Sequence, residues 1–323
     1  MSAKIDPTGV ILVGLLMLVA LSPTVDVNEE PVIPDPCNGS SDNCEKLYTD
    51  VTYPETHNAH ATIADGFNYL AANHRENLSN QWDAGFRAFM LDLHHAQFST
   101  DFANTSFCHG SQDLGVHPCI LGSQNAVELM QILHRKMDEN PRDITTLLFE
   151  LYVPYSHVEY ILNASGLLDR AHIQQFGLEW PTLHEMIANN RTLVVFVQGA
   201  TDSNYPYLHS YSEFGWTTHY ADRHPDEMTC DVLLGDSTQP VWHMNNWLGL
   251  ESGLTDFVRA PIVNSYDFLL NRSLECWAIH GSKPTFIAVD WWTDGEAVNV
   301  TRTLNQMDHW SDELPLRAAT DSR

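Results

Sequence analysis

Basic residues are scarce in this chain, and that scarcity narrows its function. The 323 residues contain 16 Lys and Arg against 42 Asp and Glu, a formal net charge of −26. A nucleic-acid binder needs a basic face to displace counterions from phosphates, so we exclude that class. Electrostatic docking on an anionic membrane is disfavoured for the same reason. An anionic substrate must therefore be met by a local positive centre, such as a metal ion or a protonated histidine.

The chain also lacks a hydrophobic run long enough to span a bilayer. The one run that approaches membrane hydrophobicity, Val10 to Leu21, has 12 residues, whereas a spanning helix needs about 20. Lys4 precedes it and a small-residue turn, Ala20 to Pro23, follows, which is typical of a secretory signal peptide. We expect residues 1–22 to be a signal peptide and no integral membrane span. The alternative is an uncleaved signal anchor.

No CxxC motif occurs, which excludes zinc-ribbon and thioredoxin-like sites. The six cysteines group locally instead, as Cys37 with Cys44 and Cys108 with Cys119, and elimination leaves Cys230 with Cys276. Three disulfides indicate an oxidising compartment. Seven Asn-x-Ser/Thr sequons agree with export, at Asn38, Asn77, Asn104, Asn163, Asn190, Asn271 and Asn299. The sequence therefore predicts a secreted glycoprotein.

Composition divides the rest of the chain into three parts. Residues 23–46 are acidic and rich in Pro, Asn and Ser, and we expect an exposed lead-in held by the Cys37–Cys44 loop. Residues 47–310 have a uniform amino-acid composition with neither linker nor repeat, which indicates one domain. Residues 311–323 resemble a flexible tail and carry no hydrophobic signal for a GPI anchor.

Short apolar runs alternate with helical patterns through this domain. Strand-like runs occur at Phe86–Leu93, Thr145–Val153, Thr192–Val197, Val241–Met244 and Pro284–Trp291. Apolar residues spaced by three and four predict a helix over Val127 to Met137 that ends before Pro141, and another over Leu183 to Ile187 after Pro181. This alternation predicts an α/β fold with a mostly parallel sheet, either open or closed as a (β/α) barrel.

Titratable side chains follow several of these runs. Asp92, Glu150 and Asp290 each come after an uninterrupted apolar stretch. Because the carboxyl ends of parallel strands face the site in such folds, we expect the three carboxylates to converge. His57 and His109 lie in loop-like settings beside such ends. Two imidazoles that face each other across a phosphodiester can supply an acid and a base near neutral pH.

Six short motifs occur in order between about residues 50 and 305. They are THN at Thr56–Asn58, GFRAFMLDL at Gly85–Leu93, CHG at Cys108–Gly110, FEL at Phe149–Leu151, WPTLHEMI at Trp180–Ile187 and PTFIAVDWW at Pro284–Trp292. Together they resemble the X domain of phosphatidylinositol-specific phospholipases C, in particular the single-domain secreted type. The resemblance implies a distorted (β/α)8 TIM barrel of the PLC-like phosphodiesterase type over residues 47–310.

The resemblance also implies roles for individual residues. His57 matches the general base that takes the proton of the inositol 2-hydroxyl. His109 matches the general acid that protonates the departing diacylglycerol oxygen, so the implied product is a cyclic inositol phosphate. Asp290 resembles the carboxylate that orients the base and raises its basicity.

The charge that develops on phosphorus needs a cation, and two sources are open. Calcium-dependent relatives bind the ion with an Asn after the first His, two acids and a later Glu. Asn58, Asp92 and Glu150 match that set, whereas Met90 replaces one acid. Three oxygen-bearing side chains completed by waters suit Ca²⁺, or alternatively Mg²⁺. Calcium-independent relatives have an Arg where this chain has His94, so a protonated His94 is the rival source.

The sequence gives less direct information about the substrate than about the reaction. Few basic residues lie near the expected site, which disfavours highly phosphorylated headgroups. Phosphatidylinositol or a glycosyl-phosphatidylinositol anchor at a membrane surface is therefore the expected substrate. One alternative is a glycerophosphodiesterase or phospholipase D-like enzyme that acts on another phosphodiester. The other is a non-catalytic secreted barrel glycoprotein, which the substitutions at Met90 and His94 favour.

Overall fold

The computed structural model describes most of the chain. The expected signal peptide, the first part of the lead-in and the last residues of the tail lie outside the described residues. The described residues are 35–97, 99–110, 115–220, 222–251 and 254–315.

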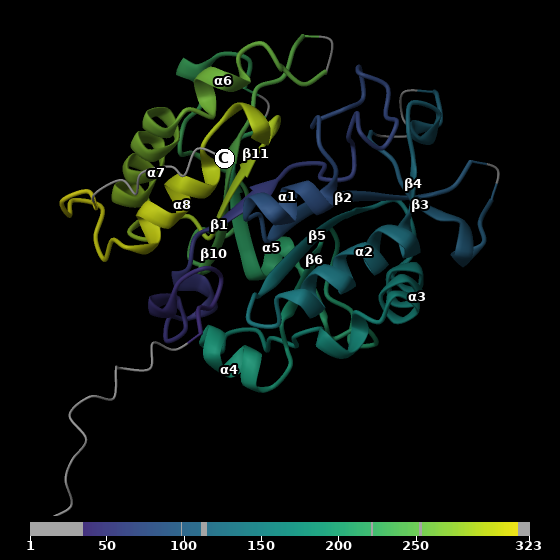
Figure 1. The fold of residues 1–323 in the computed structure, drawn as a ribbon, viewed down its shortest axis with the longest axis horizontal. Helices are drawn as coiled ribbons and strands as arrows, with labels where there is room; N and C mark the ends of the chain where they lie inside the picture. Colours follow the sequence, from purple (N-terminus) through teal and green to yellow (C-terminus); the bar gives the residue numbers. More distant parts are fainter. Residues whose placement is uncertain (1–34, 98, 111–114, 221, 252–253, 316–323) are drawn as a thin grey trace, which may run out of the picture. The chain divides into compact units, whose positions relative to one another are not determined.

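A curled 11-stranded sheet lies at the centre of the described residues (Figure 1). Eight of these strands are parallel and follow one another around the sheet in chain order: β1 (Tyr53–Thr56), β2 (Ala88–His95), β5 (Thr145–Leu151), β6 (Leu193–Val197), β7 (Leu208–Ser210), β8 (Gly215–Thr218), β10 (Val241–Asn246) and β11 (Phe286–Val289). Because β11 pairs with β1, the sheet closes on itself, except between β7 and β8, where the described residues form no pairing. The fold is a distorted, incompletely closed (β/α)8 barrel, which confirms the predicted class.

Three further strands are antiparallel to their neighbours, which the sequence did not indicate: β3 (Thr105–Phe107), β4 (Gln124–Asn125) and β9 (Val232–Gly235). β3 pairs with the last three residues of β2 and carries that strand beyond Asp92 to His95. Asp92 therefore does not end its strand as expected, and Glu150 is followed by one more residue of β5.

Helices on the outside of the sheet connect the strands. The α-helices are α1 (Leu78–Ala84), α2 (Ala126–Glu139), α3 (Tyr155–Ser165), α4 (Leu183–Ala188), α5 (Tyr211–Phe214), α6 (Ala260–Val263), α7 (Tyr266–His280) and α8 (Ala297–Asn305). Short 3₁₀ helices lie at Ser41–Asn43, Tyr48–Asp50, Phe102–Asn104, Pro118–Ile120, Leu168–Arg170, Pro225–Glu227 and Trp292–Asp294. None of the helices in the described ranges is long and apolar enough to cross a membrane.

Both helices predicted from periodicity are present. Asn125 caps α2 by accepting a hydrogen bond from the Glu128 amide at 3.1 Å, which satisfies one free donor of the first turn. Thr182 and Glu185 form a reciprocal capping box at the start of α4. Each helix buries the apolar face that the spacing predicted.

Alternation along the strands separates two layers of apolar side chains. One set, which includes Phe89, Leu147 and Val195, packs with the helices outside the sheet. The other set, which includes Ala88 and Leu148, packs inside the curled sheet. Successive side chains along a strand point to opposite faces of the sheet. Polar residues that follow Tyr53, Ala88, Leu148 or Phe286 by two or four positions therefore face inward as well. Four such residues are His57, Asp92, Glu150 and Asp290.

All three expected disulfides are present, as Cys37–Cys44, Cys108–Cys119 and Cys230–Cys276. The Cys37–Cys44 loop is less exposed than predicted, because both sulfurs belong to the apolar core inside the sheet. The Asn38 side chain also exchanges two hydrogen bonds of 2.9 Å with the backbone of Ile144. The end of the lead-in is therefore part of the packed barrel.

Candidate active site

A histidine and a carboxylate meet where β1 and β11 end. The two strands pair in parallel with Thr56 opposite Val289, so the next residues, His57 and Asp290, lie side by side. His57 Nδ1 donates to Asp290 Oδ1 at 2.9 Å. The His57 side chain is 20% exposed and that of Asp290 is 2% exposed. This pair keeps the Nε2 edge of His57 free of the carboxylate.

Other side chains hold the Asp290 carboxylate in place. Asn73 Nδ2 donates to Oδ1 at 2.9 Å, and Thr255 Oγ1 donates to Oδ2 at 2.6 Å. Burial alone would raise the pKa of Asp290, but the charge and hydrogen bond of His57 and the Thr255 hydroxyl outweigh it and lower that pKa. The carboxylate is therefore ionised and oriented before any substrate binds.

The charge around His57 favours its protonated form. Burial lowers the pKa of this imidazole, but the negative charges of Asp290, Asp92 and Glu150 together outweigh burial, and the net pKa is raised. Asn58 Nδ2 lies 3.2 Å from Nε2 and donates to it when Nδ1 carries the proton. Nε2 is thus the acceptor of the neutral ring.

His109 lines the same cavity as His57. Its Nδ1 donates to the Ala71 carbonyl at 2.7 Å, which fixes that proton and leaves Nε2 as the reactive nitrogen. Burial lowers the pKa of His109. The cavity has a volume of about 300 Å³, and both histidines line it together with Asn73, Tyr220, Arg223, Trp247, Thr255, Asp290 and the turn around Leu250. The structure therefore brings the two predicted histidines together.

Asp92 and Glu150 are direct neighbours across the β2–β5 ladder. Asp92 Oδ2 accepts from the Gly110 amide at 3.3 Å, and Glu150 Oε1 accepts from the Tyr152 hydroxyl. Burial, followed by the charge of Glu150, raises the pKa of Asp92 to about 8. The Asp92 carboxyl therefore keeps a proton near neutral pH unless a cation replaces it.

This donor set suits a hard divalent cation. Asn58 is buried, and when its amide nitrogen donates to His57 its oxygen lies on the other side of the group. Within the described ranges no three histidine, cysteine or carboxylate side chains converge as a metal site. An ion here would therefore use the Asn58 oxygen, Asp92, Glu150 and water, a mixture that calcium accepts.

The surroundings of His94 disfavour the positive charge that the rival arrangement requires. The ring is fully buried on the inner face of β2 and stacks on Tyr152, with 4.1 Å between ring centroids. Burial, together with nearby histidines, lowers the pKa of His94 to about 4. The lowered pKa disfavours a protonated His94 near pH 7 and so favours the metal as the source of positive charge.

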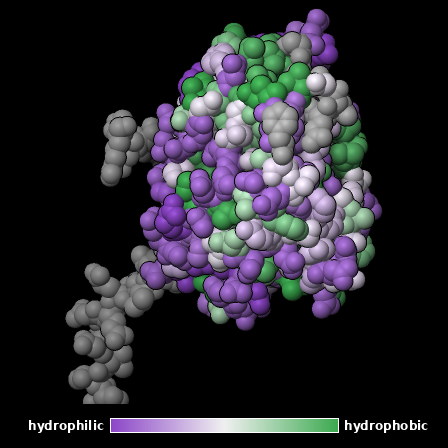
Figure 2. All heavy atoms as spheres, turned by 90° about the vertical axis from the view of Figure 1, so that its right-hand side faces the viewer, coloured by the Kyte–Doolittle hydropathy of each residue, from purple (hydrophilic) through white to green (hydrophobic). Residues whose placement is uncertain are grey.

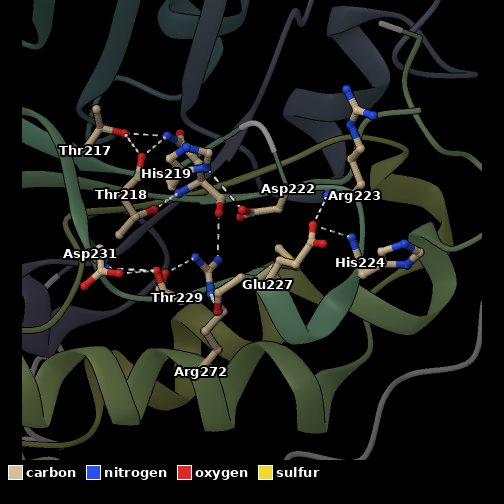
Figure 3. Close-up of polar contacts among 12 residues, drawn as sticks. Thr217, Thr218, His219, Asp222, Arg223, His224, Glu227, Thr229, Asp231 and Arg272 are labelled. Atoms are coloured by element: carbon tan, nitrogen blue, oxygen red, sulfur yellow. Dashed lines mark hydrogen bonds and ion pairs between the residues drawn. The ribbon is translucent and has the colours of Figure 1, made fainter. Parts of the chain in front are cut away.

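A hydrogen-bonded segment between β8 and β9, drawn in Figure 3, contributes Tyr220 and Arg223 to the lining of the cavity. Arg272 of α7 is buried and donates to the carbonyls of Asn245 at 2.7 Å and Thr229 at 2.8 Å, which holds this segment against β10. Arg223 projects away from that network in Figure 3. Among the described residues that line the cavity, Arg223 is the sole Lys or Arg.

Sequence analysis missed Asn73, Thr255 and Trp247. The first two donate to Asp290, and Trp247 stacks on His57 with 3.9 Å between ring centroids. Asn73 lies in the loop after β1, and Trp247 and Thr255 lie in the loop after β10, in segments without a local motif. No signal in the sequence alone pointed to them, because their role comes from the chain segments that the barrel brings together.

Comparison with known proteins gives the same family as the motifs. The family model described as PI-PLC X 1 matches residues 43–305. A PI-PLC X domain-containing protein 1 of Arthroderma benhamiae is 25% identical over 300 residues, which are 87% of this chain and 93% of that protein. An uncharacterized secreted protein of the same fungus is also 25% identical, over 86% of this chain and 66% of its own length. The disulfides and that secreted relative are consistent with an extracellular protein.

Solved structures agree on the fold. A mutant phosphatidylinositol-specific phospholipase C from Staphylococcus aureus superposes with a TM-score of 0.55 at 12% identity, over 82% of this chain and 94% of that chain. A second mutant of that enzyme gives 0.51 at 11% identity, over 77% and 88%. At such identities the likeness shows the barrel alone. With the family model covering the whole barrel, the chain belongs to the PI-PLC X domain family.

Proposed function

We propose that the protein is a phosphodiesterase that cleaves phosphatidylinositol or a glycosyl-phosphatidylinositol anchor by acid–base catalysis. The supporting observation is that His57 and His109 line one cavity and that a buried carboxylate holds the first of them. In each ring a protein acceptor fixes Nδ1, so Nε2 is the nitrogen for proton transfer; at His57 the substrate hydroxyl takes the place of the Asn58 amide, which lies 3.2 Å from Nε2. This is the arrangement that paired acid and base catalysis requires.

The proposed reaction transfers two protons. His57 Nε2 takes the proton of the inositol 2-hydroxyl while that oxygen forms a bond to phosphorus. The bond from phosphorus to the glycerol oxygen breaks, and His109 Nε2 gives its proton to that oxygen. The products are a cyclic inositol phosphate and diacylglycerol. Asp290 stabilises the imidazolium that forms at His57 and fixes its tautomer.

We propose that Asn58, Asp92 and Glu150 hold Ca²⁺ or Mg²⁺ beside this pair. When bound, such an ion supplies positive charge for the phosphoryl oxygens. The support is the chemistry of the donors and the raised pKa of Asp92, since a cation relieves the repulsion between two neighbouring carboxylates. The lowered pKa of His94 disfavours the rival source of charge.

An apolar rim beside the cavity supports action at a lipid surface. Tyr69, Leu70, Leu121 and Val258 are all exposed. Their segments are adjacent, because Tyr69 packs edge-on against Phe257 and the Asn68 amide donates to the Leu121 carbonyl at 2.6 Å. Figure 2 shows apolar side chains gathered at the upper end of the molecule, the end where Figure 1 places α6. Exposed apolar patches of this kind mark interaction sites.

The test is a product assay with matched variants. Purified protein is incubated with phosphatidylinositol vesicles, a GPI-anchored protein or glycerophosphodiesters, and products are identified by ³¹P NMR. We expect cyclic inositol phosphate from one of the first two substrates, and its loss in His57→Ala and His109→Ala. His184→Ala is the control, because His184 is exposed on α4 and does not line the cavity.

Two outcomes would contradict the proposal. Equal rates in the wild type and both histidine variants would indicate a non-catalytic barrel. Turnover of glycerophosphodiesters alone would indicate the other phosphodiesterase class.

A further inference from the structure

Trp247 covers one face of the His57 imidazole. It comes directly after β10, and its ring lies almost parallel to that of His57, with an interplanar angle of 7° and 3.9 Å between centroids. The Trp247 residue is 8% exposed, so the contact is shielded from water. A parallel stack at this distance is full van der Waals contact over the ring face.

The stack restricts a motion that hydrogen bonds alone leave open. The torsion between Cβ and the ring of a histidine is broad. At 3.9 Å, rotation about that bond drives the edge of the imidazole into the indole. The stack leaves both ring nitrogens accessible at the edges, where Nδ1 meets Asp290 and Nε2 meets Asn58.

The chain segment that supplies the indole also supplies a donor to Asp290. Trp247 and Thr255 flank a turn closed by the hydrogen bonds of Leu250 N with Leu254 O at 2.7 Å and Asp256 N with Leu248 O at 2.9 Å. Thr255 donates to Asp290, whereas Trp247 stacks on His57. One turn therefore contacts both members of the pair.

We propose that Trp247 is a positioning residue that holds the His57 imidazole in the plane in which Nδ1 meets Asp290 and Nε2 faces the cavity. The effect on catalysis rests on the function proposed above, whereas the effect on the His57 ring does not. Misplacement of a reacting group by about 1 Å costs up to about 100-fold in rate. Loss of the stack therefore lowers kcat and leaves KM nearly unchanged, since Trp247 acts through His57.

The experiment compares Trp247→Leu, Trp247→Phe and a control, Trp180→Leu. Trp180 is also a buried tryptophan, and it stacks on the ring of Tyr48. It belongs to the apolar core and does not line the cavity that contains His57 and His109. We expect Trp247→Leu to lower kcat by about 10- to 100-fold with KM within about twofold, and Trp247→Phe to restore most of kcat. Trp180→Leu lowers the melting temperature without that loss of kcat.

A second measurement needs no substrate. The ring protons of His57, assigned in histidine-labelled protein by their absence in His57→Ala, are shifted upfield in the wild type because they lie over the indole face. They move downfield in Trp247→Leu and stay in place in Trp180→Leu. Wild-type His57 protons without an upfield shift would overturn the proposal even if no Leu variant folds. An unchanged kcat in Trp247→Leu, or an equal loss in Trp180→Leu, would overturn it as well.

If the upfield shift is present but no phosphodiester is cleaved, the proposed function fails and the stack stands.

Discussion

Replacement of Asp290 by Asn tests how much of the proposed catalysis depends on the charge behind His57. The substitution keeps the shape of the side chain and removes its charge. Which end of the new amide faces His57 decides the outcome. An oxygen there preserves the Nδ1–H tautomer, whereas an NH₂ group there forces the proton onto Nε2 and removes the base.

Asn73 decides that orientation. Its Nδ2 donates to the same Asp290 oxygen as His57, so an NH₂ at that position would face another donor. The amide oxygen therefore takes the Oδ1 position, and the amide nitrogen faces the Thr255 hydroxyl, which can accept. The loss is then the charge assistance of one hydrogen bond, about 1.5–3 kcal/mol. At about 1.4 kcal/mol for each factor of ten, we expect a 10- to 150-fold drop in kcat/KM.

The assay is cyclic inositol phosphate release at pH 7, with Asp294→Asn as the control. Asp294 also follows β11 but pairs with Arg75 instead of His57. The control should stay within about threefold of the wild type. A drop below threefold in Asp290→Asn would refute the role of the charge. A drop near 10⁴-fold would refute the orientation of the new amide at position 290 that Asn73 is argued to impose.

The dependence of the rate on pH gives an independent test of the roles of His57 and Asp290. Catalysis requires His57 neutral and His109 protonated, yet the pKa of His57 is raised and that of His109 is lowered. The productive form is then a minority species. The acid limb of a bell-shaped profile follows the lower pKa and the alkaline limb follows the higher one, that of His57. Asp290→Asn lowers the pKa of His57, so we expect the alkaline limb to move to lower pH.

Chelation with EGTA should abolish turnover and added Ca²⁺ should restore it; full activity in chelator would refute the metal proposal. Acid should destabilise the fold, because burial lowers the pKa of His74, His94 and His209 to about 4, and the unfolded chain binds more protons between pH 6.5 and 4. Each of these three histidines contributes about 3 kcal/mol to the free energy of unfolding, which is lost as the pH falls through this window. The raised pKa of Asp92 has the opposite effect and offsets the contribution of about one histidine. A melting temperature that stays constant from pH 6.5 to 4.5 would contradict this prediction. Mass spectrometry of protein from a secretory host should find glycans on the exposed sequons of α3 and α7 but none on Asn38, whose amide is bonded to the Ile144 backbone.

Much of the barrel could be predicted because its signals are local. Apolar runs, helical spacing and caps depend on neighbouring residues, so the strands from Phe86 to Leu93 and from Thr145 to Val153 and the helix over Val127 to Met137 were found within a few residues. The antiparallel β3 was missed because its three residues carry no periodicity of their own. It forms by pairing with the end of β2, a contact that the sequence does not display.

The amino-acid sequence by itself determined the class of fold, the family, the three disulfides and the identity of both histidines, since motifs and spacing carry that information. Tertiary structure alone decided which groups control those histidines. The parallel register of β1 and β11 brings Asp290 to His57, and loops after different strands add Asn73, Thr255 and Trp247. Burial then shifted the pKa values, because it lowered that of His94 and raised that of Asp92. A pKa depends on solvent and neighbours in three dimensions, and residues distant along the chain become neighbours only when the sheet closes.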